Sequence, residues 1–504
     1  MDVVSNKSDT KSPATVTNKI ETKVAVRSYI SGAAFTSSSS ETLQLFNPAN
    51  GRESILMPVG SDLDAIEAVA SAKKAFEYGL WPSLSKATRQ SLLHSFANLI
   101  EKHALDLDRL DAEDMGKPIG LPFGNASSAA SLLRYSIDAM ESITGDAYNS
   151  DKSCLIAQQL VPRGVVAAVV PWNFPTLSAM TKVAPALVAG NCVVLKPSEQ
   201  SPQSASRLAE LATEAGIPPG VLNVVQGQGN IVARALGLHN DVNMIAFTGS
   251  TSVGKLMLQY AGQSNMKVAH VECGGKSPQM VFADCHDLDV VADSIVELIL
   301  LNQGQLCITG SRVIVEQKIE LELIEKIIQR FRKVSPGDPL DPSTTYGPMA
   351  SLQHMQKVLG CIEAGAKTAN LMYGGQRLDF NNGFFVEPTL FGNVSVEDPL
   401  FQDEVFGPVL TITRFRTLDE AIEVANATAY GLAAYAWTTN LNTGMRLSTE
   451  VQAGMVTVNA STPTGEGSEA ISTEPYGLSG VGTEFGIAGL ASYSRAQVRW
   501  FNHG

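Results

Sequence analysis

The chain has 504 residues, of which 44% are hydrophobic and 17% charged, a composition typical of a large folded protein and unlike that of a disordered one. Its formal net charge is -13. This charge repels phosphate backbones and anionic lipid, so we expect neither nucleic acid nor a membrane surface as a partner. No uninterrupted apolar run reaches the roughly 20 residues needed to cross a bilayer.

Residues 1–23 are rich in Ser, Thr and Lys and contain no apolar segment followed by a cleavage site. We interpret them as a flexible tail and expect a cytoplasmic protein. Six cysteines are scattered along the chain without a C-x-x-C pair, and no histidine cluster has metal-ligand spacing. We therefore expect neither a disulfide framework nor a metal site.

The first predicted elements are short strand-like pieces over 24–60, followed by a helical pattern over 62–140 in which apolar residues recur at three- and four-residue steps. From residue 164 onward, apolar segments alternate with helical ones. We predict strands at 164–170, 192–196, 221–225, 244–249 and 267–272, and helices at 175–190, 204–216, 230–238 and 252–262. Strands that are apolar throughout and alternate with helices favour a parallel sheet covered on both faces.

A second alternating run follows, with strands predicted at 279–284 and 312–316 and helices at 288–301 and 319–333, and it continues to 456–459. The predicted fold class is α/β, with two doubly wound parallel sheets. The two units meet near 274–278, where the ends of parallel strands leave a crevice of the kind that binds ligands.

Two segments nearly match phosphate-binding motifs. "GSTSVGKL" (249–256) resembles a P-loop but has Leu256 where a hydroxyl should bind Mg²⁺, and "GQGNIV" (227–232) has Val232 where a dinucleotide fingerprint needs glycine. Each could simply be a tight turn. Together they predict two strand-to-helix turns whose free backbone amides can bind an anion such as a nucleotide.

The segment "KPSE" at a third strand end adds Lys196 and Glu199. A carboxylate there can accept hydrogen bonds from ribose hydroxyls and would repel a 2′-phosphate. The alternative is an exposed pair at the start of a helix.

A candidate nucleophile is Cys307, which ends the segment "NQGQLC" just after a long apolar run. Most lone cysteines are small buried hydrophobes, and we interpret Cys154, Cys192, Cys285 and Cys361 in this way, leaving Cys273 open. For Cys307, Gly304 and Gln305 permit close approach of a substrate, which a buried structural cysteine would not need.

Three other segments supply partners for this thiol. "PWNFP" places the amide of Asn173 after a buried strand, "HVECGGKSP" places Glu272 at another strand end, and "DEVFGPV" supplies Glu404 and Phe406. A cysteine, an amide donor, a carboxylate and dinucleotide-binding turns suit the covalent oxidation of an aldehyde.

At this point the sequence resembles the aldehyde dehydrogenase superfamily from about residue 24 to 500. Six segments match in the family's order: "PWNFP", "KPSE", "FTGSTSVGK", "ECGGKSP", "NQGQLC" and "EVFGPV". Among the branches, "HNDVNMIAFTGS" and "AGQSNMKVAHVECGGKS" are similar to the γ-glutamyl-γ-aminobutyraldehyde dehydrogenases.

The resemblance implies a role for each matched residue. Cys307 attacks the aldehyde carbonyl, Asn173 and the backbone N–H of Cys307 hold the oxyanion, and Glu272 deprotonates the water that hydrolyses the thioester. Glu272 favours water over coenzyme A as the acceptor. The implied cofactor is NAD, with NADP as the alternative, and the residues expected to hold it are Trp172, Lys196, Ser198, Glu199, Gly229, Gly249, Ser250, Glu404 and Phe406.

The resemblance also implies three structural parts. These are an NAD-binding domain (24–147 and 165–274), a catalytic domain (275–486) and a small β oligomerisation arm (148–164 and 487–504). By analogy we expect a homodimer or homotetramer. Two departures from the family concern "PYGLSGVGTEFG" (475–486), which lacks a usual lysine, and the segment 459–475, which is longer than the family norm.

The substrate tunnel is expected along the helix after "PWNFP", where Phe174, Ser178 and Thr181 share one face. Related proteins often have bulky residues on this face, whereas Ser178 and Thr181 are small, and apolar Leu306 and Ile308 flank the thiol. We therefore predict a roomy, mostly apolar tunnel for a bulky or aromatic aldehyde, or a semialdehyde without a free carboxylate. Glu466, Glu469 and Glu474 near the mouth leave an ω-amino or γ-glutamylamino aldehyde as the alternative, or simply face solvent.

Three rival functions come from other classes. An NTP-binding module would use 249–256, but Leu256 argues against it. A non-catalytic member of the same fold would not need Cys307, Glu272 and Asn173 together. A cofactor-free thiol hydrolase would need a histidine, and none lies in the six matched segments; the nearest is His270, two residues before Glu272.

Overall fold

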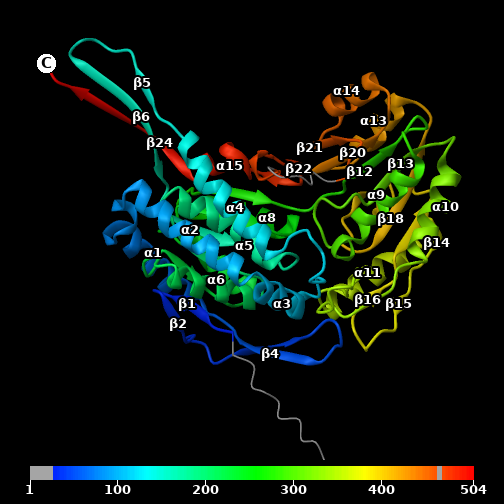
Figure 1. Ribbon diagram of the computed structural model, residues 1–504, viewed down its shortest axis with the longest axis horizontal. Coiled ribbons are helices and arrows are strands. Elements are labelled where there is room, and N and C mark those ends of the chain that lie inside the picture. Colours follow the sequence, from blue (N-terminus) through cyan, green and yellow to red (C-terminus); the bar gives the residue numbers. More distant parts are fainter. Residues whose placement is uncertain (1–25, 462–467) are drawn as a thin grey trace, which may run out of the picture.

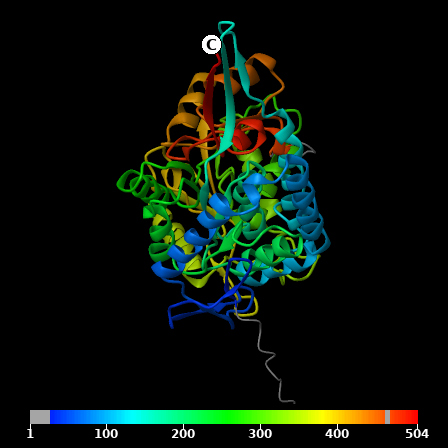
Figure 2. The ribbon, with the colours of Figure 1, turned by 90° about the vertical axis from the view of Figure 1, so that its left-hand side faces the viewer.

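The computed structural model of the chain describes residues 26–461 and 468–504. The predicted tail 1–23 and Glu466 lie outside the described residues. Two α/β units lie side by side, and a β arm extends from one of them (Figures 1 and 2). Within the described residues, no helix is long and apolar enough to cross a membrane.

The first unit is built on an eight-stranded sheet in the order β2-β1-β9-β8-β7-β10-β11-β23. Its central strands, from β9 to β11, are parallel. Strands β1 and β23 run antiparallel to their neighbours β9 and β11, and the edge strand β2 runs antiparallel to β1. The strands are β1 (Ser28–Ile30), β2 (Ala33–Phe35), β7 (Val165–Val169), β8 (Cys192–Lys196), β9 (Leu222–Val224), β10 (Met244–Thr248), β11 (Val268–Glu272) and β23 (Gly480–Val481).

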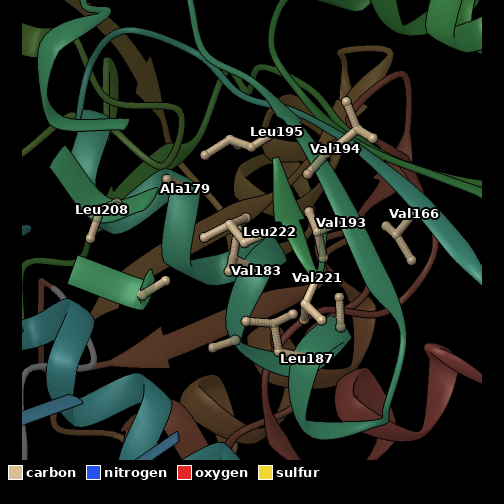
Figure 3. Packing of buried hydrophobic residues seen from close by; sticks show 14 of the residues in the cluster. Val166, Ala179, Val183, Leu187, Val193, Val194, Leu195, Leu208, Val221 and Leu222 are labelled. Atoms are coloured by element: carbon tan, nitrogen blue, oxygen red, sulfur yellow. The ribbon is translucent and has the colours of Figure 1, made fainter. Parts of the chain in front are cut away.

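Helices cover both faces of this sheet because its central strands are apolar on both sides. In Figure 3, Val183 and Leu187 pack near the side chains of Val193 and Leu222 in the core between the sheet and its helices. The helices of the unit are α1 (Asp62–Tyr78), α2 (Lys86–Lys102), α3 (Ala104–Met115), α4 (Ala126–Ala139), α5 (Pro175–Val188), α6 (Gln203–Glu214), α7 (Arg234–Leu238), α8 (Thr251–Gln263) and α15 (Gly486–Ser492).

The helix predicted over 230–238 begins differently from the expectation. A π-helical turn, η3 (Gly229–Ala233), comes first, and the regular helix α7 occupies only the last residues. Short 3₁₀ turns elsewhere in the chain are η1 (Trp81–Ser83), η2 (Met140–Ser142) and η5 (Ser468–Ala470).

The second unit contains a seven-stranded sheet in the order β14-β17-β18-β13-β12-β20-β21, parallel except for the edge strand β14. Its strands are β12 (Pro278–Val281), β13 (Arg312–Glu316), β14 (Asn370–Tyr373), β17 (Thr389–Gly392), β18 (Val409–Phe415), β20 (Ala433–Trp437) and β21 (Met455–Val458). The surrounding helices are α9 (Leu288–Leu300), α10 (Glu320–Phe331), α11 (Leu352–Gly365), α12 (Pro399–Gln402), α13 (Leu418–Asn426) and α14 (Leu441–Glu450), with the turn η4 (Leu301–Gly304) after α9.

A three-stranded antiparallel sheet forms the arm, which projects away from both units (Figures 1 and 2). It consists of β5 (Asp146–Tyr148), β6 (Cys154–Pro162) and β24 (Ser494–Asn502). The arm therefore brings together two segments that lie far apart in the sequence. Several of its large apolar side chains are exposed: Tyr148, Leu155, Leu160, Val498, Trp500 and Phe501. The remaining strands form small hairpins and pairs: β3 (Thr42–Phe46) with β4 (Glu53–Pro58), β15 (Arg377–Leu378) with β16 (Phe385–Val386), and β19 (Tyr430–Gly431) with β22 (Tyr476–Gly477).

The two sheets are linked by a short segment of chain. Strand β11 ends at Glu272 and β12 begins at Pro278. The connection 273–277 therefore lies at the carboxyl end of the first sheet, where α/β sheets bind their ligands. The chain later returns to the first sheet, since Gly480 of β23 pairs with Glu272.

We predict that Leu410→Ala lowers the free energy of unfolding by about 2 to 5 kcal/mol, because Leu410 is fully buried in β18 and its removal leaves a cavity. Denaturant unfolding measures the change. Leu441→Ala is the control, since this side chain is 77% exposed at the start of α14 and should change stability by no more than about 0.5 kcal/mol. Equal effects of the two substitutions would contradict the described core.

Candidate active site

The candidate nucleophile lies on a loop with an unusual backbone. After α9, Asn302, Gln303 and Gly304 all have positive φ angles, of 47°, 56° and 70°. The helix predicted to run to residue 301 therefore stops at Leu300. A Cβ on Gly304 would lie 2.3 Å from the backbone oxygen of Gly407, so only glycine fits at this position.

Gln305 holds this loop through both ends of its buried side chain. Its Nε2 donates to the backbone oxygen of Asn302 at 3.0 Å, and its Oε1 accepts from the backbone amide of Ala350 at 2.9 Å. A buried amide that is satisfied at both ends fixes the direction of the backbone beside it. Gly304 and Gln305 thus shape the loop that presents Cys307.

Asn173 both donates a hydrogen bond to this loop and accepts one from it. Its Nδ2 donates to the backbone oxygen of Gln305 at 3.0 Å, and Asn302 Nδ2 donates to the backbone oxygen of Asn173 at 2.9 Å. A carboxamide has two N–H donors, so one donor of Asn173 remains for another acceptor near Cys307.

Glu272 ends β11 and is largely buried. Burial raises the pKa of this carboxyl well above its ordinary value, although Lys182 acts in the opposite direction. Its Oε1 has no hydrogen-bond partner among the described atoms. A carboxylic acid with a raised pKa can exchange protons near neutral pH, as a general base must.

Lys182 is a functional candidate that the sequence reasoning missed. It lies on α5, is buried, and forms an ion pair with Glu484. Burial lowers its pKa, whereas the negative charges of Glu272 and Cys307 in the thiolate form act to raise it. A lysine within the apolar pattern of this helix was the available signal, because buried lysines are rare unless they are paired.

The thiol of Cys307 is half-buried and neutral in the ligand-free protein. Burial, together with the negative charges of Glu404 and Glu272, raises its pKa to about 12. Since only the thiolate is a good nucleophile, the site needs a nearby base or a positive charge before Cys307 can react.

A cluster of aromatic rings lies beside this loop. The ring of Trp172 makes edge contacts with Phe406 and His354, at centroid distances of 5.3 Å and 5.1 Å. Phe406 has a φ of 60°, which is uncommon for a residue other than glycine and carries a conformational cost. His354 was not found from the sequence; its Nε2 lies 2.7 Å from the backbone oxygen of Phe406, and burial lowers its pKa to about 4, so a neutral ring donates this bond.

Lys196 and Glu199 form an ion pair at the end of β8, with 2.9 Å between Nζ and Oε2. Because Lys196 is buried, they are not the exposed pair considered as the alternative. Burial would raise the pKa of Glu199, but Lys196 and the backbone amide of Gly229 hold it below its ordinary value. The segments "KPSE" and "GQGNIV", predicted separately, therefore meet. Ser198 lies between the paired residues, and its Oγ accepts from the backbone amide of Gln200.

Helix α8 begins after Gly249 and Ser250. Ser250 makes no side-chain capping bond to the helix, so the first amides of α8 are left for another acceptor. The backbone amide of Gly249 donates to the backbone oxygen of Glu272 at 3.0 Å, which connects this turn to the candidate base.

Glu404 reaches the segment that links the two sheets. Its Oε1 accepts from the backbone amide of Gly275 at 3.0 Å, and a Cβ on Gly274 would lie 2.0 Å from its Oε2. Burial raises the pKa of Glu404 to about 7. The two glycines of "ECGGKSP" thus allow this carboxylate to approach the backbone.

The residues expected to line a tunnel fall into two groups. Phe174, Leu306 and Ile308 pack in one apolar cluster with Cys307 and Phe123, whose ring meets Phe174 edge-on at 5.4 Å. Ser178 and Thr181 are polar, partly buried residues of α5. Thr181 instead faces a hollow between α4, α5 and α15, whose other lining residues include Leu132, Tyr135, Glu484, Phe485 and Leu490.

Comparison with known proteins bears on the whole chain. The family model described as "Aldehyde dehydrogenase family" matches residues 35–498. The NADP/NAD-dependent aldehyde dehydrogenase PuuC of Escherichia coli is 38% identical over 94% of this chain and 95% of its own. An aminoacetaldehyde dehydrogenase of Pseudomonas aeruginosa is 41% identical over 87% of this chain and 90% of its own.

Solved structures agree with the sequence comparison. An indole-3-acetaldehyde dehydrogenase in complex with NAD⁺ matches with a TM-score of 0.92 and 40% identity, covering 95% of this chain and 97% of that one. The predicted α/β fold class with two parallel-sheet units is confirmed by this match and by the two sheets described above.

We predict that alkylation of Cys307 in the ligand-free protein accelerates steadily between about pH 7 and pH 9.5 without levelling off, because a thiol with a strongly raised pKa gains thiolate throughout this range. Peptide mass spectrometry after timed exposure to iodoacetamide measures the rate at this residue. Free glutathione is the control and should begin to level off near the top of the range. A plateau for Cys307 near neutral pH would contradict the described burial.

Proposed function

The chain belongs to the aldehyde dehydrogenase family, and on this premise we propose that it oxidises an aldehyde to the carboxylic acid with NAD(P)⁺ through a covalent intermediate on Cys307. One observation carries the residue assignment. The loop of Cys307, the amide of Asn173 and the carboxylate of Glu272 converge where the two sheets join, with Lys182 close enough to influence both Glu272 and Cys307.

In the first step, Cys307 Sγ attacks the carbonyl carbon and its proton passes to a base. Glu272 suits this task, because its raised pKa lets it accept a proton from a weakly acidic thiol. The positive charge of Lys182 favours the ionised forms of both groups. The carbonyl oxygen becomes negative and is held by the free N–H of Asn173 and by the backbone N–H of Cys307.

The strand-to-helix turns beside this site suit a dinucleotide. A Cβ on Gly229 would meet nothing within 4 Å, which leaves open space over the Lys196–Glu199 pair, and the first amides of α8 are free for a pyrophosphate. Lys196, Ser198 and Glu199 would hold the adenosine ribose, Gly249 and Ser250 the pyrophosphate, and Trp172, Glu404 and Phe406 the nicotinamide end. When bound, the cofactor would accept the hydride that the thiohemiacetal loses.

In the second step, water hydrolyses the resulting thioester. Glu272 takes a proton from the attacking water, for which a carboxylate with a pKa nearer neutrality is well suited. Asn173 again stabilises the oxyanion. The Lys182–Glu484 pair beside Glu272 can pass the proton on, since its lysine has a lowered pKa and its glutamate is partly exposed.

The proposed substrate is a bulky apolar or aromatic aldehyde, or a semialdehyde without a free carboxylate. The small side chain of Thr181 leaves a hollow with apolar walls, and the lining residues of this hollow include Glu484 but neither lysine nor arginine. Such a lining disfavours a carboxylate at the far end of the substrate. The similar indole-3-acetaldehyde dehydrogenase is named for an aromatic aldehyde, which agrees with this proposal.

An ω-amino or γ-glutamylamino aldehyde is the second candidate. The carboxylate of Glu469 adds to the raised pKa of Tyr135, which lines the hollow, so negative charge lies near the position that a cationic tail would reach. The names of the aminoacetaldehyde dehydrogenase and of a γ-glutamyl-γ-aminobutyraldehyde dehydrogenase structure, 41% identical, favour this alternative.

Further proposals concern the cofactor, the domains and the assembly. The negative charge of Glu199 would oppose a 2′-phosphate, so we propose NAD as the preferred cofactor and NADP as the alternative. We propose an NAD-binding domain over 24–147 and 165–274 and a catalytic domain over 275–486. The exposed apolar residues of the arm, such as Trp500, support its role in a homodimer or homotetramer. The six free cysteines suit a cytoplasmic enzyme.

We expect Glu272→Gln to slow the first burst of NADH and to lower steady-state turnover at least about 100-fold, because an amide can accept a proton neither from the Cys307 thiol nor from the attacking water. Stopped-flow absorbance of the reduced nicotinamide separates the two phases. In the wild type, kcat should rise with pH through an apparent pKa above the ordinary carboxylic range of about 4.3, and Glu272→Gln should lack this limb. Cys307→Ala is the control and should show neither burst nor turnover.

We expect Thr181→Trp to lower kcat/KM for a benzaldehyde-type substrate by about tenfold or more while changing that for propanal little, since the indole would fill the hollow. Thr181→Ser is the matched control and should leave both values nearly unchanged. Comparison with succinic semialdehyde and an ω-amino aldehyde tests the substrate class. Highest activity on succinic semialdehyde would overturn the proposed preference.

A further inference from the structure

Aspartate side chains of helix α3 cap the N-termini of three other helices. Three aspartates at steps of three residues accept hydrogen bonds from first-turn amides. Asp108 accepts from Ala126 at the start of α4 (2.9 Å), Asp111 from Thr176 in α5 (3.1 Å), and Asp114 from Gln203 at the start of α6 (3.0 Å). All three side chains are buried. Carboxylates at helix N-termini satisfy free amides and interact favourably with the helix dipole.

Of the three capped helices, α5 has the closest connection to the proposed chemistry. Its own N-cap residue, Phe174, makes no capping bond, and Asn173 directly precedes it. By contrast, α4 has a side-chain cap of its own, because Asn125 accepts from the amide of Ser128. The start of α5 thus depends on Asp111 for an acceptor that its own sequence does not provide.

The other end of α3 contacts the segment that supports the cysteine loop. Gly116 ends α3, and a Cβ there would lie 2.5 Å from the side chain of Pro348. Two residues later, the amide of Ala350 donates to Gln305 Oε1. Since Gln305 O in turn accepts from Asn173 Nδ2, the contacts form a closed path from Asp111 through α5, Asn173 and Gln305 back to α3.

We propose that Asp111 is a positioning residue for the oxyanion-binding amide of Asn173, acting through the N-terminus of α5. A buried carboxylate there fixes the first turn of α5 and, with it, the backbone from which the Asn173 side chain extends. Burial raises the pKa of Asp111 to about 6, whereas Lys117, also fully buried, acts in the opposite direction and favours the carboxylate. Misplacing a group that stabilises the transition state by about 1 Å can cost up to about 100-fold in rate.

The experiment compares Asp111→Asn with Asp108→Asn in a double-mutant cycle with Asn173→Ala. Asp108 is a matched control, because it is a buried aspartate on the same helix, is attracted by the same Lys117, and also caps a helix, but α4 carries none of the proposed catalytic groups. The readouts are kcat/KM from NADH absorbance, the thermal unfolding midpoint, and the shift of that midpoint by NAD, which reports cofactor binding.

We expect Asp111→Asn to lower kcat/KM by about tenfold, with its effect mainly on kcat, while the NAD-induced shift is retained. Asp108→Asn should lower the unfolding midpoint comparably but change kcat/KM by no more than about twofold. In the Asn173→Ala background, itself about 100- to 1000-fold less active, Asp111→Asn should cause no further loss, because the two residues act through one amide.

The inference is overturned if Asp111→Asn leaves kcat/KM unchanged, if Asp108→Asn lowers it equally, or if the Asp111→Asn loss persists in full without the Asn173 amide. Should Asp111→Asn fail to bind NAD, the same cycle is run with Asp111→Ser, which keeps a neutral acceptor. The inference rests on the proposed role of Asn173. That role fails separately if Asn173→Ala alone remains fully active.

Discussion

The hydrogen bonds between Asn173 and the loop before Cys307 are the constraint on which the site depends. Asn173 follows a strand of the first sheet, whereas Asn302 and Gln305 belong to the second unit. Their reciprocal amide bonds hold the side chain of Asn173, the proposed oxyanion donor, against the loop that leads to Cys307, and they do so across the junction of two separately packed cores. In this arrangement Asn302 and Gln303 adopt positive φ angles, which are unfavourable for residues other than glycine.

Burial gives the ionisable groups of the site their chemical character. Glu272, Glu404 and Cys307 have raised pKa values, and Lys182 has a lowered one, because a low-dielectric surrounding disfavours each charged form. The pKa values of Glu272, Glu404 and Lys182 therefore lie closer to pH 7 than they would in water, whereas that of Cys307 lies further from it. Protons can then move between Glu272 and Lys182 at small cost, which the proposed hydrolysis of the thioester requires.

The glycines around the site act by leaving space where a side chain would collide. Gly304 allows the cysteine loop to approach Gly407, Gly274 allows Glu404 to reach the backbone, and Gly229 leaves room over the Lys196–Glu199 pair. The near match of 249–256 to a P-loop has a simple physical origin. A turn into a helix offers amides to a phosphate with or without a Mg²⁺-binding hydroxyl, so Leu256 is compatible with a dinucleotide.

The sequence by itself determined the α/β class, the positions of many strands along the chain and the family, because continuous apolar strands alternating with helices and six ordered motifs are local signals. It also indicated Cys307, Asn173 and Glu272, each of which ends or follows a predicted element. Only the tertiary structure revealed Lys182, His354 and Asp111, and the early end of α9 at Leu300. These features depend on contacts between residues far apart in the chain, such as Lys182 with Glu484 and Asp111 with Thr176, and no local pattern encodes a partner that folding brings in from elsewhere in the chain.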